Sequence, residues 1–223
     1  MRDNEIDEIL RQNPGETDPA LLDRISGRLV SSLQPVRPMA PSWLLAIALF
    51  LSSTVIAVAG AGVLGFHGLA HLNRAEIAWI FPLLAVLAWA ASRLSAGETI
   101  PGAMLPVNAT ALLTLCVLAT VAVFALLFHN YSTAGFVPQG VPCLAAGLLT
   151  AVPAGLVAWL ILRRGLALNP AAAGLAAGTL AGLAGVAMLE LHCPNQHALH
   201  VMFWHAAVIP LAALAGALLA RIR

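Results

Sequence analysis

The chain has 223 residues, of which 60% are hydrophobic and only 9% are charged. A soluble domain has about 25% charged residues, and a chain of this length cannot bury so much apolar surface in one water-soluble core. The formal net charge of +1 speaks against a nucleic-acid-binding surface. The composition therefore predicts an all-α integral membrane protein whose main solvent is the lipid bilayer.

Residues 1–40 form a polar tail, which we expect to be a cytoplasmic domain separate from a transmembrane domain over 41–223. We expect two short helices in the tail. The first spans roughly 3–12, and the second begins at Asp18, an N-cap residue followed by proline. Apolar residues of the second helix recur every three or four positions and make one stripe, formed by Leu22, Ile25, Leu29 and Leu33.

Six apolar runs follow, each long enough or nearly long enough to cross about 30 Å of hydrocarbon. We place them near 43–64, 77–94, 109–128, 142–162, 171–191 and 201–220. Ten of the eleven arginines lie in the tail, the even-numbered connections and the C-terminal end, whereas all seven histidines lie in or beside the odd-numbered connections. Because positive residues favour the cytoplasmic side, this bias predicts that both termini lie on the cytoplasmic side of the membrane.

The fifth run contains a doubled small-xxx-small pattern, in which glycines let helix backbones approach closely. Two interpretations stay open: packing inside one six-helix bundle, or a homodimer seam. The pattern is formed by Gly174, Gly178 and Gly182.

Cys143 opens the fourth run and Cys193 closes the fifth. Antiparallel helices of similar length return the chain to the same depth, so both thiols are expected at the outer face of the membrane. A reversible disulfide or a shared soft metal ion would then be within reach. The alternative is that both cysteines serve only as small apolar residues at helix ends. Cys116 lies near the middle of the third run and is expected to be a packing residue.

The densest group of ligand-type side chains spans residues 190–200, with one more histidine at 205. Together with the two thiols they could hold a soft or borderline transition metal, although their spacing matches no strong metal motif. The alternative is that the histidines are ordinary interfacial residues. The candidate ligands are Glu190, His192, His197, His200 and His205. Glu190 also needs a partner such as His192, His205 or Arg74, because an ionisable group in an apolar run is costly unless paired.

No catalytic pattern is present: the chain has no GxSxG, no Walker loop and no CxxCH. The runs also lack the charged pathway that transporters usually need. We therefore expect no enzymatic activity.

Four features resemble the NrsF-like family of integral-membrane anti-sigma factors, the negative regulators of sigma F. They are the polar tail with its Leu-Leu-Asp-Arg-Ile segment at 21–25, the six runs over about 43–220, the pair Cys143 and Cys193, and the Leu-His-Cys-Pro stretch at 191–194 followed by Trp204 and His205. The resemblance covers essentially the whole chain.

The resemblance implies that the tail holds an extracytoplasmic-function sigma factor inactive at the membrane. It also implies that Cys143 and Cys193 sense heavy-metal or oxidative stress on the periplasmic side and release that factor. The tail fits this role, because an amphipathic segment too short to fold alone can become ordered on a partner. The residues expected in an apolar groove of the sigma factor are Leu21, Leu22, Ile25, Leu29 and Leu33.

Three alternatives remain at this level. The tail helix could lie on the membrane surface, although its mixed acidic and basic polar face is unlike the basic face of such helices. The chain could instead be a small polytopic metal-binding or metal-transport protein that uses the outer histidines. A membrane thiol oxidoreductase is a third possibility, against which the absence of a CxxC pair speaks.

Overall fold

The computed structural model of the chain describes residues 23–24, 26–28, 30, 40–103 and 106–222. The chain divides into two compact units, Met1–Pro38 and Met39–Arg223. The described residues of the first unit are helical. The helix expected over 3–12 lies outside the described residues. So do the expected sigma-factor contact residues Leu21, Leu22, Ile25, Leu29 and Leu33, the last four of which form the apolar stripe.

The second unit contains six helical segments that are long and apolar enough to cross a membrane. The first five are α3 (Ser42–Leu64), α4 (Arg74–Glu98), α5 (Ala109–Leu127), α6 (Phe136–Leu162) and α7 (Pro170–His192). The sixth, Ala198–Arg221, is built from α8 (Ala198–His200), the π-helix η1 (Val201–His205) and α9 (Ala206–Arg221). No strand occurs among the described residues, so the predicted six-helix, all-α membrane fold is confirmed.

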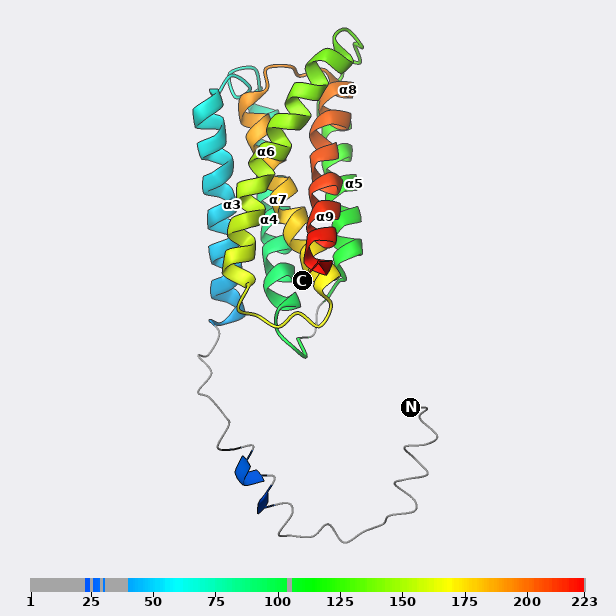
Figure 1. Cartoon of the computed structure of the whole chain (residues 1–223). Helices are drawn as coiled ribbons and strands as arrows, with labels where there is room; N and C mark the ends of the chain where they lie inside the picture. The colour runs from blue at the N-terminus through cyan, green and yellow to red at the C-terminus, as the bar shows by residue number, and fades with distance from the viewer. Residues whose placement is uncertain (1–22, 25, 29, 31–39, 104–105, 223) are drawn as a thin grey trace, which may run out of the picture. The chain divides into compact units, whose positions relative to one another are not determined.

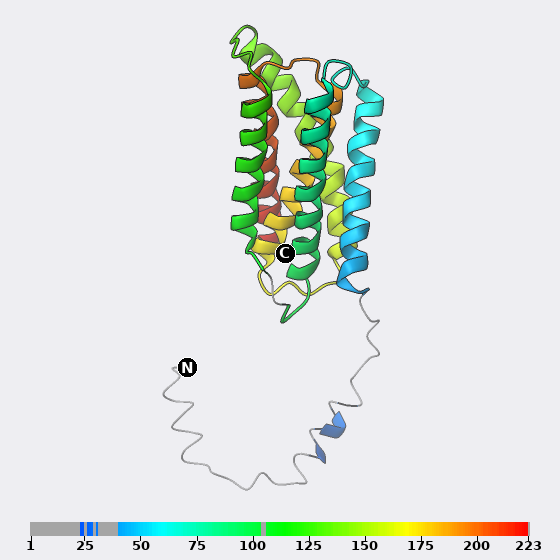
Figure 2. The same ribbon diagram turned by 180° about the vertical axis from the view of Figure 1, so that it is seen from behind.

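The six segments stand side by side as an up-and-down bundle (Figures 1 and 2). The connections 65–73, 128–135 and 193–197 lie at the upper end in Figure 1, which we call the cysteine end. The connections 99–108 and 163–169 and the C-terminus of α9 lie at the opposite end, which we call the arginine end. This alternation follows from the short connections, which oblige consecutive helices to run antiparallel.

Helices α4 and α6 begin earlier than their apolar runs predict. Asn73 and Glu76 form a capping box that starts α4 at Arg74: the Asn73 side chain accepts from the Glu76 N–H at 3.0 Å, and Glu76 accepts from the Asn73 N–H at 2.7 Å. Helix α6 begins at Phe136, after Gly135 with a φ of 68°. The predicted apolar run begins only at residue 142 and so leaves out the first part of α6. A helix can extend beyond the hydrocarbon, and there its side chains need not be apolar.

Helix α7 is the centre of the bundle and contacts each of the other five long helices. In the most apolar stretch of α7, 67% of the residues are buried, whereas the corresponding share in the other membrane-spanning segments is 22–39%. A helix surrounded in this way must present small side chains to its neighbours, and the Ala- and Gly-rich sequence of α7 does so.

The three glycines of the small-xxx-small pattern in α7 face α9 of the same chain. A Cβ added to Gly182 would lie 2.7 Å from the Cα of Ile209, and one added to Gly178 would meet the backbone oxygen of Ala212. Gly174 is equally close to the backbone of Gly216. Of the two interpretations of this pattern, packing inside one bundle is therefore the one observed, and these glycines leave no open seam for a second copy.

We expect Gly182→Ala to destabilise the bundle by about 1–3 kcal/mol, because its new methyl group would have to push α9 away. Gly155→Ala on α6 is the matched control, since its Cβ would lie at an ordinary 3.7 Å from the Cβ of Ala181. Both changes gain the same helix propensity, about 1 kcal/mol. The two variants are compared by heating the detergent-solubilised protein and following the loss of its monodisperse peak, which gives a midpoint temperature of unfolding. Equal midpoints for the two variants would contradict the assigned packing.

Candidate functional site

Two thiols that are 50 positions apart in the sequence meet at the cysteine end. Cys143 lies in α6, about two turns from its start, and Cys193 follows directly after α7. Their Sγ atoms are 3.2 Å apart, so the expected return of the two helices to one depth is observed. The hydrogen bond with Cys143 and burial both raise the pKa of the Cys193 thiol above its ordinary value.

Two histidines lie beside the thiol pair. The Nε2 atom of His200 is 3.5 Å from the Sγ of Cys193. The His205 ring packs edge-on against the His200 ring, with centroids 5.2 Å apart. Both histidines and Cys193 are buried, whereas Cys143 is half-buried. One ligand atom from each of these four residues lies within 4.8 Å of every other, and we call this group the Cys-His cluster.

A local departure from α-helical geometry brings the two histidines together. Residues five apart point in directions about 140° apart on an α-helix of 3.6 residues per turn. Between His200 and His205 the chain instead forms the π-helix η1, in which the Ala206 N–H donates to the Val201 carbonyl. A π turn closes i→i+5 hydrogen bonds, so residues five apart come to lie above one another, and such turns are frequent at functional sites.

Glu190 lies directly behind His205. Its Oε1 atom is 2.6 Å from the Nδ1 of His205, and both side chains are fully buried. His205 is thus the partner of Glu190, one of the three candidates named from the sequence. Because Nδ1 is engaged by the carboxylate, Nε2 is the nitrogen that remains for a ligand. That Nε2 has no hydrogen-bond partner among the described residues.

The end of α7 is held in place by the α3–α4 connection. The Gly68 N–H donates to the carbonyl of His192 at 3.0 Å, and the Leu69 N–H donates to that of Leu191 at 3.2 Å. A Cβ on Gly68 would lie 2.6 Å from the Glu190 carbonyl oxygen, so only glycine permits this approach. The backbone that carries Glu190 and Cys193 is therefore fixed by a segment remote in sequence.

Two of the histidines proposed from the sequence lie outside the Cys-His cluster. His192 points to the α3–α4 connection, where its Nδ1 is 2.9 Å from the Gly65 carbonyl and its ring contacts that of His67. His197 is the N-cap residue of α8 and is half-buried. Cys116 is buried in the hydrophobic core, as expected of a packing residue.

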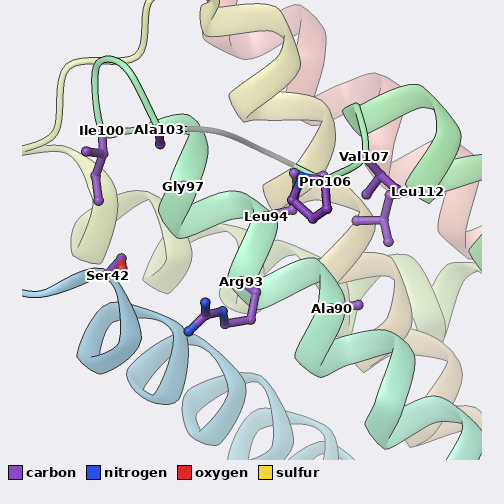
Figure 3. A pocket seen from close by; sticks show the side chains of 10 residues that line it. All are labelled: Ser42, Ala90, Arg93, Leu94, Gly97, Ile100, Ala103, Pro106, Val107 and Leu112. Atoms are coloured by element: carbon purple, nitrogen blue, oxygen red, sulfur yellow. The ribbon is translucent and has the colours of Figure 1, made fainter.

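A separate hollow of about 270 Å³ opens at the arginine end (Figure 3). It lies between the start of α3, the last turns of α4 and the connection to α5, and Arg93 is the one charged side chain among the described residues that line it. None of the site residues proposed from the sequence lines this hollow, which is therefore unrelated to the Cys-His cluster.

Two sulfur and two nitrogen donors within one small volume form a ligand set suited to soft and borderline metals. The same thiols, at 3.2 Å, are also close enough to be joined by an oxidant with little movement. The arrangement thus supports metal binding and thiol oxidation, both of which the sequence left open.

Among known families, the one described as negative regulator of sigma F (NrsF) matches the chain over residues 29–223. The chain belongs to the NrsF family. No curated protein and no solved structure matches it. Membership makes the chain a negative regulator of a sigma factor and implies a sigma factor as its partner, in agreement with the resemblance noted from the sequence.

Sequence reasoning on this NrsF-family chain missed the residues that shape the cluster without contributing a ligand. Gly68 is one, and Gly140 is another, because a Cβ there would collide with the indole ring of Trp204, the residue before His205. Their only signal in the sequence is a glycine near the end of an apolar run. The π-helix has no recognisable sequence signal.

We expect a mild oxidant to join Cys143 to Cys193 within one chain and to leave Cys116 reduced. Membranes would be oxidised, denatured and labelled with maleimide-polyethylene glycol, and adducts counted by gel mobility. The reduced chain should gain three adducts and the oxidised chain one, because the chain has three cysteines. Cys143→Ser is the control and should gain two adducts in both states. Three adducts on the oxidised wild-type chain would mean that the thiols do not meet.

Proposed function

We propose that the chain is a membrane-bound anti-sigma factor that holds an extracytoplasmic-function sigma factor through its N-terminal tail. It releases that factor when Cys143 and Cys193, with the neighbouring histidines, respond to a metal or an oxidant. Membership of the NrsF family supports the regulatory role. The observation that carries the sensing role is the meeting of the two thiols at 3.2 Å in a cluster with two buried histidines.

The distribution of charge supports an orientation with the cysteine end in the periplasm. Arginines gather at the arginine end and in the tail, and the positive-inside tendency places such residues in the cytoplasm. In a bacterial inner membrane both termini would then face the cytoplasm, where sigma factors act. The thiols would face the oxidising compartment, where a reversible disulfide can persist.

The tail supplies the binding element in this proposal. Its apolar positions follow a three- and four-residue spacing, typical of a helix that lays one face into a groove of its partner. A short segment of this kind gains most of its order from the partner, which suits reversible capture and release. The contact residues would be Leu21, Leu22, Ile25, Leu29 and Leu33.

Metal transport is a weaker candidate because the polar side chains of the bundle are already engaged. Five of the eight hydroxyl residues in α3, α5 and α6 donate to carbonyls of their own helix, namely Ser52, Ser53, Thr54, Thr114 and Thr150. Such hydroxyls cannot readily pass an ion through the bundle. A homodimer is no part of the proposal, since the glycines that suggested one are covered by α9.

We expect Leu29→Asp to weaken capture of the sigma factor at least about tenfold, because a charge would enter the apolar contact. The measurement is co-purification of the sigma factor with the full-length, detergent-solubilised protein. Ser31→Asp is the matched control, since it adds the same charge about half a helical turn away from the stripe. If both variants capture the sigma factor equally well, the stripe is not the binding face.

We expect Cys143→Ser and Cys193→Ser, singly and together, to abolish induction of a sigma-dependent reporter by cadmium and by peroxide. Repression without inducer should persist, because the tail is unchanged. Cys116→Ser should respond as the wild type does, since its thiol is buried in the core. An unaltered induction curve in the double variant would remove the thiol pair from sensing.

A further inference from the structure

We propose that Cys143, Cys193, His200 and His205 bind one divalent, thiophilic d¹⁰ ion, such as Zn²⁺ or Cd²⁺, in a closed four-coordinate site. Glu190 is the positioning residue that holds His205 for this ion. The binding site itself is independent of the sigma factor. That the ion acts as a signal rests on the proposed function.

The donor separations fit a tetrahedral ion. Metal–sulfur bonds of about 2.3 Å and metal–nitrogen bonds of about 2.0–2.1 Å require donors roughly 3.3–3.8 Å apart. The Sγ atoms are 3.2 Å apart, the Cys193 Sγ is 3.5 Å from the His200 Nε2, and no pair in the set exceeds 4.8 Å. Shifts of about an ångström or less would therefore close all four donors on one ion.

The charge of the ligand set favours a divalent ion. As the ion binds, the two thiols lose their protons to solvent and become thiolates, while both imidazoles bind as neutral ligands. A divalent ion compensates the two thiolate charges, whereas a monovalent ion would leave one additional negative charge in a buried site beside Glu190. Uncompensated buried charge is costly, so the site should discriminate between the two.

Glu190 completes the arrangement in the way usual for metal-binding histidines. Such histidines donate their second ring N–H to a carboxylate, which fixes the tautomer and the direction of the ring. The 2.6 Å contact between the Glu190 Oε1 and the His205 Nδ1 has this form. It leaves the unpartnered Nε2 of His205 as the donor to the ion. A buried carboxylate at the end of a membrane helix is otherwise hard to explain.

The four ligands come from three parts of the bundle: α6, the residue after α7, and the α8–η1 segment (Figure 1). A bound ion would therefore tie together the cysteine ends of three helices. Because α7 contacts every other long helix, a shift at its end would affect the packing of the whole bundle.

The test uses the full-length reduced protein in detergent, titrated with Cd²⁺ and, in parallel, with Co²⁺ as a spectroscopic substitute. We expect one ion per chain, a thiolate-to-metal charge-transfer band, and visible bands of tetrahedral cobalt. His205→Ala and Glu190→Gln should each weaken binding about 10–100-fold, with Glu190→Gln keeping the thiolate band. His197→Ala and Cys116→Ser are matched controls outside the cluster and should bind as the wild type does.

A second measurement keeps the proposal testable if a variant fails to fold. In the unaltered, folded protein Cd²⁺ should slow maleimide labelling of Cys143, which is half-buried, and washing with a chelator should restore it. Binding without a thiolate band, no protection of Cys143, or wild-type affinity in folded His205→Ala would each overturn the site.

The sigma-dependent reporter distinguishes failure of the metal site from failure of the proposed sensing role. An ion bound as described that induces nothing in cells would refute the proposed sensing role and leave the site standing. Induction that depends on the thiols, in a protein that binds no ion, would refute the site and leave oxidation as the signal.

Discussion

The small side chains of α7 are the constraint on which the rest of the bundle depends. This helix is enclosed by the other five, and its glycines bring the α9 backbone within a distance that no Cβ would allow. In a bilayer, helices gain little from excluding lipid, so close packing of this kind supplies much of the association. It also sets where the ends of α7 and α9 lie. The position of Cys193 relative to the residues before α9 follows from that packing.

The paired Glu190 and His205 set a second condition at the same end. An ionisable side chain buried in a membrane helix is expensive unless a partner lies beside it, and here each side chain is fully buried against the other. Forming the pair requires α7 and η1 to be adjacent and the His205 ring to be turned inward. The contact can therefore form only when the helices are arranged in this way. It also leaves the second ring nitrogen of His205 free beside the thiols.

The two ends of the bundle differ in chemistry in a manner that suits a regulator. Thiols and imidazoles gather at the cysteine end, whereas the arginine end holds guanidinium groups and a hollow with little other polarity. In the proposed function the signal and the captured sigma factor lie on opposite faces of the membrane. A change at the Cys-His cluster would have to cross the bundle, and α7 is the element that contacts every other long helix.

The sequence by itself determined the six spans, the common depth of Cys143 and Cys193 on consecutive helices, and the family. These follow from apolar length and from the antiparallel return of consecutive helices, which are local properties of the chain. Only the tertiary structure decided that His200 and His205 join the thiols while His192 and His197 do not. The direction of a ring depends on the π turn, and the partner of Glu190 depends on which helix covers it. The glycine pattern was ambiguous for a similar reason. Its spacing predicts a close helix contact but does not show whether the partner helix belongs to the same chain or to a second copy.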